Sequence, residues 1–110
     1  MTVVQITLPL EKIESFCERW KISEFALFGS VLRDDFHDNS DIDILVEFEL
    51  GANYSLFDLV VMEDELQLIF QRDIDLITRT GISRSRNYLR RDNILNSAIT
   101  IYESRSRVSS

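Results

Sequence analysis

Residues 29–46 read GSVLRDDFHDNSDIDILV, a Gly-Ser pair followed after ten residues by alternating aspartate and aliphatic side chains. Successive side chains of a β-strand point to opposite faces, so Asp41 and Asp43 face one side and Ile42 and Ile44 the other. The two Cα atoms are then about 6.6 Å apart, and at an effective dielectric of about 20 the carboxylates repel by about 2 kcal/mol. A cation turns this repulsion into attraction, and Mg²⁺ commonly takes one or two protein carboxylates together with substrate phosphates. The spacing therefore predicts a Mg²⁺ site.

The Gly-Ser pair supplies a phosphate-binding turn beside these acids. Gly29 lets the backbone approach a ligand closely, and N–H groups beside the Ser30 hydroxyl can hold an anion. We expect Ser30 to open a brief helix toward Arg33, and helix N-termini attract anions. Taken alone, Gly-Ser also fits an ordinary turn, and Asp-x-Asp also fits the solvated face of a strand.

A second acidic strand is expected at residues 71–78, which read QRDIDLIT. Here Ile74 and Leu76 share one face, and Asp73 and Asp75 share the other. Taken alone, Asp75 fits an exposed acid on the solvated face of this strand. Carboxylates beside a phosphate-binding turn suit phosphoryl or nucleotidyl transfer, which needs positioning and charge neutralisation more than reactive side chains.

These motifs resemble the signature of the nucleotidyltransferase superfamily related to DNA polymerase β. Residues 29–33 and 40–48 are most similar to the minimal nucleotidyltransferases, including the MntA-type antitoxins. The resemblance implies an α+β fold, a small mixed sheet flanked by helices. It implies an enzyme with these candidate residues: Asp41, Asp43 and Asp75 for Mg²⁺ and catalysis, with Asp75 preparing the attacking hydroxyl, and Gly29, Ser30 and Arg33 for the nucleotide.

The resemblance also implies a reaction and a partner. AMP would pass from ATP to a hydroxyl, and the acceptor would be a tyrosine of a HEPN-type toxin, which AMP blocks. The alternative is a weak or inactive binding module that neutralises its partner by occlusion, although the intact acids favour the enzyme. Members of this family often associate as dimers or as larger complexes with their partners, so the resemblance also implies a homo-oligomer as an expectation.

Two positions depart from the family pattern. Asp34 stands where a glycine often follows the arginine, and Asp73 stands where a basic residue is common. Because negative charge beside a triphosphate is unfavourable, these acids call efficiency or substrate preference into question. His37 in the same loop has no ligating partner, so we interpret it as an exposed turn residue.

Composition frames these motifs. The chain has 110 residues, 45% of them hydrophobic, which suits one domain over 1–103, with 104–110 expected to be disordered. The single Cys17 excludes an internal disulfide, suits a reducing cytoplasm and is expected to be a buried, inert thiol. No apolar stretch of about 18 residues and no signal region is seen, so we expect neither membrane insertion nor secretion.

Charge is unevenly distributed along the chain. Residues 1–78 carry a net charge of −12 and residues 79–110 a net charge of +5, for a total of −7. This acidity opposes direct nucleic-acid binding, which depends on neutralising phosphates, and favours a basic protein partner. Four arginines of the last third either form a solvated helix face or contact phosphates or a partner: Arg84, Arg86, Arg90 and Arg91.

Apolar spacing and turn residues predict alternating helices and strands. Trp20 lies on the apolar stripe of the first helix and is expected in the core. Ser55 and Asp58 form a capping pattern for the second long helix. The expected elements are a helix from Pro9 to Trp20, strands 25–28 and 42–48, a helix from Ser55, the strand within 71–78, a helix from the Gly81–Ser83 turn to about Ala98, and a strand 99–102.

Overall fold

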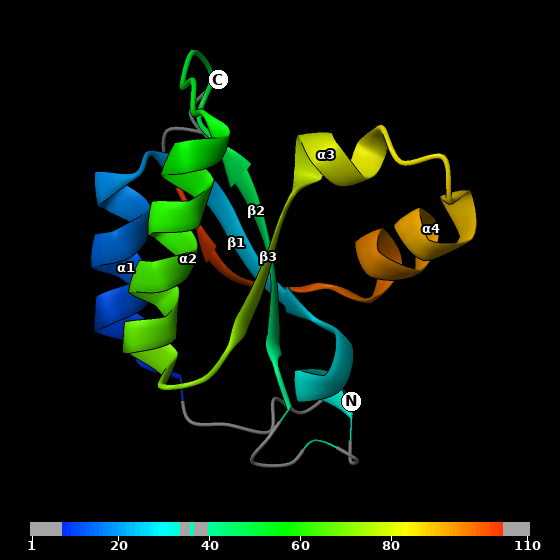
Figure 1. Ribbon diagram of the computed structural model, residues 1–110, viewed down its shortest axis with the longest axis horizontal. Helices are drawn as coiled ribbons and strands as arrows, with labels where there is room; N and C mark the ends of the chain where they lie inside the picture. Colours follow the sequence, from blue (N-terminus) through cyan, green and yellow to red (C-terminus); the bar gives the residue numbers. More distant parts are fainter. Residues whose placement is uncertain (1–7, 34–35, 37–39, 105–110) are drawn as a thin grey trace.

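A four-stranded mixed sheet forms the centre of the computed structural model, which describes residues 8–33, 36 and 40–104 (Figure 1). The strand order is β3-β2-β1-β4; β1 is antiparallel to β2 and β4, whereas β2 and β3 are parallel. The strands span Ile22–Phe28 (β1), Ile42–Phe48 (β2), Ile74–Thr78 (β3) and Ile99–Glu103 (β4). The predicted fold class, a small mixed sheet flanked by helices, is confirmed.

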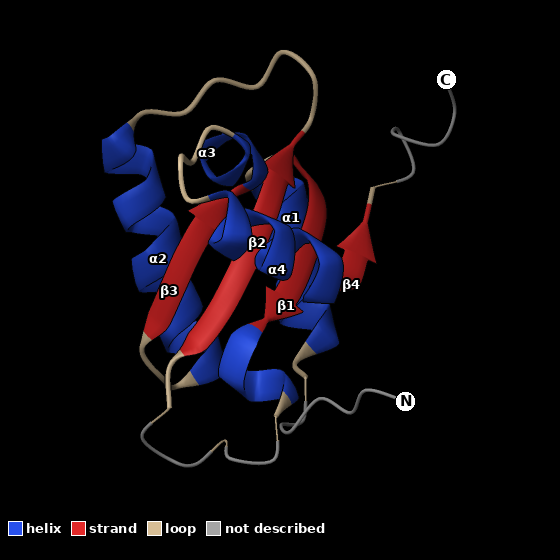
Figure 2. Ribbon diagram, turned by 90° about the vertical axis from the view of Figure 1, so that its right-hand side faces the viewer, coloured by secondary structure: helices blue, strands red, loops and turns tan. Residues whose placement is uncertain are grey.

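Helices cover both faces of this sheet. The helices α1 (Leu10–Arg19) and α2 (Leu56–Phe70) lie on one face, and α3 (Arg79–Ser83) and α4 (Tyr88–Ser97) lie on the other (Figures 1 and 2). The predicted capping pattern starts α2: the Asp58 N–H donates to Ser55 Oγ at 3.2 Å, and the Ser55 N–H donates to Asp58 Oδ2 at 3.0 Å. None of the described helices is long and apolar enough to cross a membrane.

The two faces of β2 contribute to separate cores, which confirms the predicted alternation. Ile42, Ile44 and Val46 belong to the larger core beneath α1 and α2, together with residues such as Phe16, Phe25, Met62 and Leu66. Leu45 belongs to a smaller core with Ala26, Phe28, Ile82 and Ile94 beneath α3 and α4. Asp41 and Asp43 therefore lie on the face with the smaller core, where less apolar cover surrounds them.

Local differences from the sequence-based elements have physical causes. Strand β1 starts at Ile22 rather than Phe25, because its residues lie between two neighbouring strands and are buried throughout. The last predicted helix is divided into α3 and α4; the Gly81 N–H donates to Thr78 Oγ1 at 3.0 Å, which starts a short helix before the expected turn.

Single residues of the first helix behave as expected. Cys17 is fully buried, and burial, followed by the charges of Glu14 and Glu18, raises the pKa of its thiol to about 12. Trp20 packs against the larger core and directs its indole N–H to Glu65 Oε2 at 3.2 Å. At the other end, the Ser104 N–H donates to Ser23 O at 2.8 Å, while 105–110 of the expected tail lie outside the described residues.

Candidate active site

The parallel pairing of β2 and β3 brings the predicted acids together. Asp43 and Asp75 are register partners, and the Ile42 N–H donates to Asp73 O at 2.9 Å one position earlier. Partnered residues in neighbouring strands point to the same face, so the Asp43 and Asp75 carboxylates lie side by side. Asp41 immediately precedes β2 and shares this face. The structure thus gathers the three acids that the sequence singled out at one end of two adjoining strands.

The Gly-Ser turn closes around Asp43 from the other side. Phe28, the last residue of β1, is the register partner of Asp43, so Gly29 follows directly beside that carboxylate. Gly29 has φ +74°, and a Cβ built there would lie 2.2 Å from Asp43 Oδ2. Only glycine fits this position without displacing the carboxylate. The Ser30 backbone N–H donates to the Asp43 carboxylate, and Ser30 Oγ donates to Asp41 O at 3.2 Å.

Electrostatics single out Asp43 among these acids. Burial is the largest cause that raises the pKa of Asp43, and the neighbouring charge of Asp75 is the next largest. Asp41 raises the pKa of Asp43 further, whereas the Ser30 N–H and the Arg33 guanidinium act in the opposite direction. An ionised Asp43 is therefore stabilised by additional positive charge nearby.

The donor chemistry of these acids suits a hard cation. Carboxylate oxygens are the ligands that Mg²⁺ accepts, and one or two of them suffice when substrate phosphates supply the rest. As the side chains stand, no three His, Cys, Asp or Glu residues within the described part of the chain form a ready metal-holding group. The donor set therefore suits an ion held jointly by protein carboxylates and a phosphate ligand.

The remaining predicted positions lie around this centre. Arg33 follows the short 3₁₀ helix η1 (Gly29–Leu32), where it is exposed and close enough to lower the pKa of Asp43. Asp73 is exposed just before β3, on the same face as Asp75. Asp34 and His37 lie outside the described residues. Of the arginines near α4, Arg84, Arg86 and Arg90 are exposed, and Arg91 Nε pairs with Asp92 Oδ1 at 3.3 Å.

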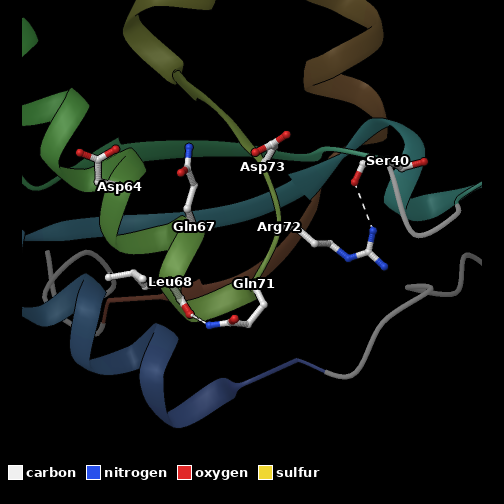
Figure 3. Close-up of a pocket in the computed structure, with 7 residues that line it drawn as sticks. All are labelled: Ser40, Asp64, Gln67, Leu68, Gln71, Arg72 and Asp73. Atoms are coloured by element: carbon white, nitrogen blue, oxygen red, sulfur yellow. Dashed lines mark hydrogen bonds between the residues drawn. The ribbon is translucent and has the colours of Figure 1, made fainter.

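One contact near the acids had no signal in the sequence. Arg72 Nη1 donates to Ser40 O at 3.2 Å (Figure 3), and its guanidinium lies 4.4 Å from the centroid of the Phe36 ring. These contacts join the segment that leads into Asp41 to the segment that leads into Asp75. A single arginine before an alternating strand shows no periodicity, so only the tertiary structure reveals its role.

The sequence matches a protein-family model and several individual relatives. The model described as nucleotidyltransferase domain matches residues 11–101. A Methanocaldococcus jannaschii protein, provisionally named protein adenylyltransferase MJ0435, is 38% identical over 80 residues, which are 73% of this chain and 80% of the relative. Protein adenylyltransferase MntA of Thermococcus cleftensis is 32% identical over 83 residues, covering 68% of this chain and 82% of the relative.

Solved structures share the same fold. A chain from a toxin-antitoxin crystal structure with AMP-PNP has a TM-score of 0.68 and 20% identity, covering 91% of this chain and 77% of its own length. A chain from a complex of tri-AMPylated Shewanella oneidensis HEPN toxin with MNT antitoxin has a TM-score of 0.60 and 18% identity, covering 90% and 73%. At these identities the likeness establishes the fold.

Proposed function

The chain belongs to the nucleotidyltransferase domain family, in its minimal, MntA-related branch, and we propose that it transfers AMP from ATP to a tyrosine of a HEPN-type toxin. In this proposal the chain is the antitoxin of a toxin-antitoxin pair. Two kinds of relative support it: those named protein adenylyltransferase, and fold neighbours solved with AMP-PNP or with an AMPylated HEPN toxin. The structural observation that carries it is the position of Asp43, between Asp75 on one side and the Gly29–Ser30 turn on the other.

Each proposed role follows from the place of the residue in the fold. Asp41 and Asp43 would hold Mg²⁺, which neutralises phosphate charge and stabilises the attacking and leaving oxygens when bound. Gly29 and Ser30 hold the β- and γ-phosphates, because the turn exposes backbone N–H groups beside a hydroxyl. Arg33 adds positive charge on the nucleotide side of the same turn.

Asp75 acts on the acceptor in this proposal. The tyrosine oxygen bonds to the α-phosphorus while the bond from that phosphorus to the oxygen of the β-phosphate breaks, so pyrophosphate leaves. The tyrosine proton passes to the Asp75 carboxylate, which is exposed on β3 and therefore accessible to a hydroxyl from outside. In this proposal Asp75 also helps to bind the metal that Asp41 and Asp43 hold.

Radiolabelled ATP tests the proposed reaction. The full chain is incubated with Mg²⁺ and the product of the neighbouring gene, which the proposal expects to be a HEPN-type protein, using ATP labelled at the α- or the γ-phosphate in parallel. We expect label on the toxin tyrosine from the α-labelled ATP only, and none with Asp43→Asn. Label from the γ-phosphate would indicate phosphoryl transfer instead. A stable complex without label from either ATP would contradict the enzymatic proposal and support neutralisation by occlusion.

A further inference from the structure

The order of the strands fixes the side from which an acceptor reaches the acids. The phosphate-binding turn follows β1, Asp43 lies on β2, and Asp75 lies on β3, which is an edge strand of the described sheet. In phosphoryl and nucleotidyl transfer the attacking and leaving oxygens are roughly in line. Because the leaving pyrophosphate is assigned to the turn after β1, the attacking hydroxyl must approach from the β3 edge.

A pocket of about 770 Å³ lies at this β3 edge (Figure 3). Asp73 forms part of its wall and shares a face with Asp75, so their Cα atoms are about 6.6 Å apart. The pocket is within the usual size range for ligand sites, about 300–1,000 Å³. Its lining combines the end of α2 with the start of β3: Ser40, Asp64, Gln67, Leu68, Gln71, Arg72 and Asp73.

The lining chemistry suits a polypeptide with a basic side chain. Asp64 and Asp73 bring two carboxylates, and Gln67 brings an amide that can donate to or accept from a peptide group. The Arg72 guanidinium is engaged with Ser40 O and with the Phe36 ring. Leu68, which is 73% exposed, adds an apolar contact at the rim. Such a lining repels phosphates and attracts cations.

We infer that this pocket, here called the β3-edge pocket, binds the acceptor protein and holds a basic residue close to the acceptor tyrosine. The inference rests on the proposed function, because the direction of approach follows from the in-line reaction. It goes further by naming Asp64 and Gln67 of α2 as residues that determine acceptor specificity without touching the reacting atoms. The net acidity of the pocket makes it distinct from the nucleotide side of the site.

Charge reversal at Asp64 tests the inference in the full chain. For Asp64→Lys we expect KM for the HEPN-type acceptor to rise about tenfold, equivalent to about 1.4 kcal/mol of lost attraction, while KM for ATP stays within about twofold. Glu63→Lys makes the same charge change on the same helix outside the lining, and we expect both KM values to stay as in the wild type. An unchanged acceptor KM in Asp64→Lys would overturn the inference.

Photo-crosslinking gives a readout that does not require catalysis. The photoreactive residue p-benzoylphenylalanine replaces Leu68 at the pocket or, as a control, Phe57, which is 75% exposed near the start of the same helix. Crosslinking to the acceptor from position 68 supports the inference, and crosslinking from position 57 alone contradicts it. Crosslinking from position 68 without AMP transfer by any variant means that the proposed function fails while the docking surface stands. AMP transfer that is unchanged by Asp64→Lys and by the replacement at position 68 means that the proposed function stands while the docking inference fails.

Discussion

At Asp43 a half-buried carboxylate lies between a second carboxylate and a turn that leaves no room for a side chain. The sequence alone could predict that the Asp41 and Asp43 carboxylates share one face, because acids separated by one residue in a strand point to the same side. It could not predict that Gly29 contacts Asp43, because their approach depends on the pairing of β1 with β2. The contact explains why the motif requires glycine as well as a phosphate-binding turn.

Substitution of Gly29 separates crowding from backbone strain. In Gly29→Ala the new Cβ would lie 2.2 Å from Asp43 Oδ2, and the residue would keep a φ of +74°. We therefore expect the free energy of unfolding to fall by about 2–3 kcal/mol. AMP transfer should fall at least about tenfold, because the Asp43 carboxylate is displaced. Gly51→Ala is the matched control, because Gly51 has φ +84° with nothing within 4 Å of its Cβ. It should lose about 1 kcal/mol and keep its activity. Urea unfolding measures the free energy of unfolding, and label transfer measures the activity. Equal effects of the two substitutions would contradict the close approach of Gly29 to Asp43.

The raised pKa of Asp43 predicts a stability that depends on pH in a defined direction. The folded chain binds the Asp43 proton more tightly than the unfolded chain, so stability rises as the pH falls through the pKa of folded Asp43. At pH 7 the ionised carboxylate costs stability, mainly because of its burial and the charge of Asp75. In EDTA, Asp43→Asn should therefore raise Tm at pH 7, whereas in a separate assay with Mg²⁺ it should abolish AMP transfer.

The gain should shrink as the pH is lowered through the raised pKa of folded Asp43, because the wild-type carboxyl is then protonated as well. Thermal unfolding at a series of pH values measures this trend. A gain in Tm that is the same at every pH would show that the Asp43 charge is not its cause.

At the scale of the elements, local patterns predicted most helices and strands, whereas long-range contacts determined how they are placed. The capping pattern at Ser55 and the alternation of β2 are local and appeared as expected. The register of β2 with β3 joins residues about thirty positions apart, so only the resemblance indicated that Asp75 meets Asp43. The separate helix α3 was missed: its cap at Thr78 is local, but the Arg79–Glu24 ion pair that holds it against the sheet joins residues far apart in the sequence.

A partly buried ion pair holds α3 against the sheet on the face of the active site. Arg79 Nη2 lies 2.9 Å from Glu24 Oε1, and Thr100 Oγ1 donates to Glu24 Oε2 at 2.7 Å. Removing Arg79 leaves a carboxylate that is only 12% exposed without this cation. We expect Arg79→Met to lower the free energy of unfolding by about 2–3 kcal/mol, and the double variant Glu24→Gln, Arg79→Met to recover part of the loss.

Arg19 provides the control for this prediction. Its side chain is 59% exposed and pairs with Glu65 at 2.9 Å, so Arg19→Met should cost at most about 1 kcal/mol. Urea unfolding compares the three variants. A loss in Arg79→Met no greater than that in Arg19→Met would show that the Glu24 pair does not anchor α3.

At the scale of the whole molecule, the larger core and the candidate active site lie on opposite faces of the sheet. The helices α1 and α2 lie on one face of the sheet, and α3 and α4 lie on the other (Figure 2). The larger core lies beneath α1 and α2, whereas Asp43 and Asp75 face the other side, where the smaller core lies. The acidic first part of the chain supplies the predicted metal ligands, and the arginine-rich last part forms α3, α4 and their connection. We therefore propose that the nucleotide phosphates bind at the turn, the acceptor at the β3 edge, and a cation between them.

The most direct measurement is a crystal structure of the full chain with Mn²⁺ and AMP-PNP, in which anomalous scattering locates the metal. We expect Mn²⁺ bound by Asp41 and Asp43 together with the phosphates, with the β- and γ-phosphates against Gly29 and Ser30 and Asp75 facing the α-phosphate. Mn²⁺ and the triphosphate bound away from Asp41 and Asp43, or an Asp75 side chain turned away from them, would contradict the account.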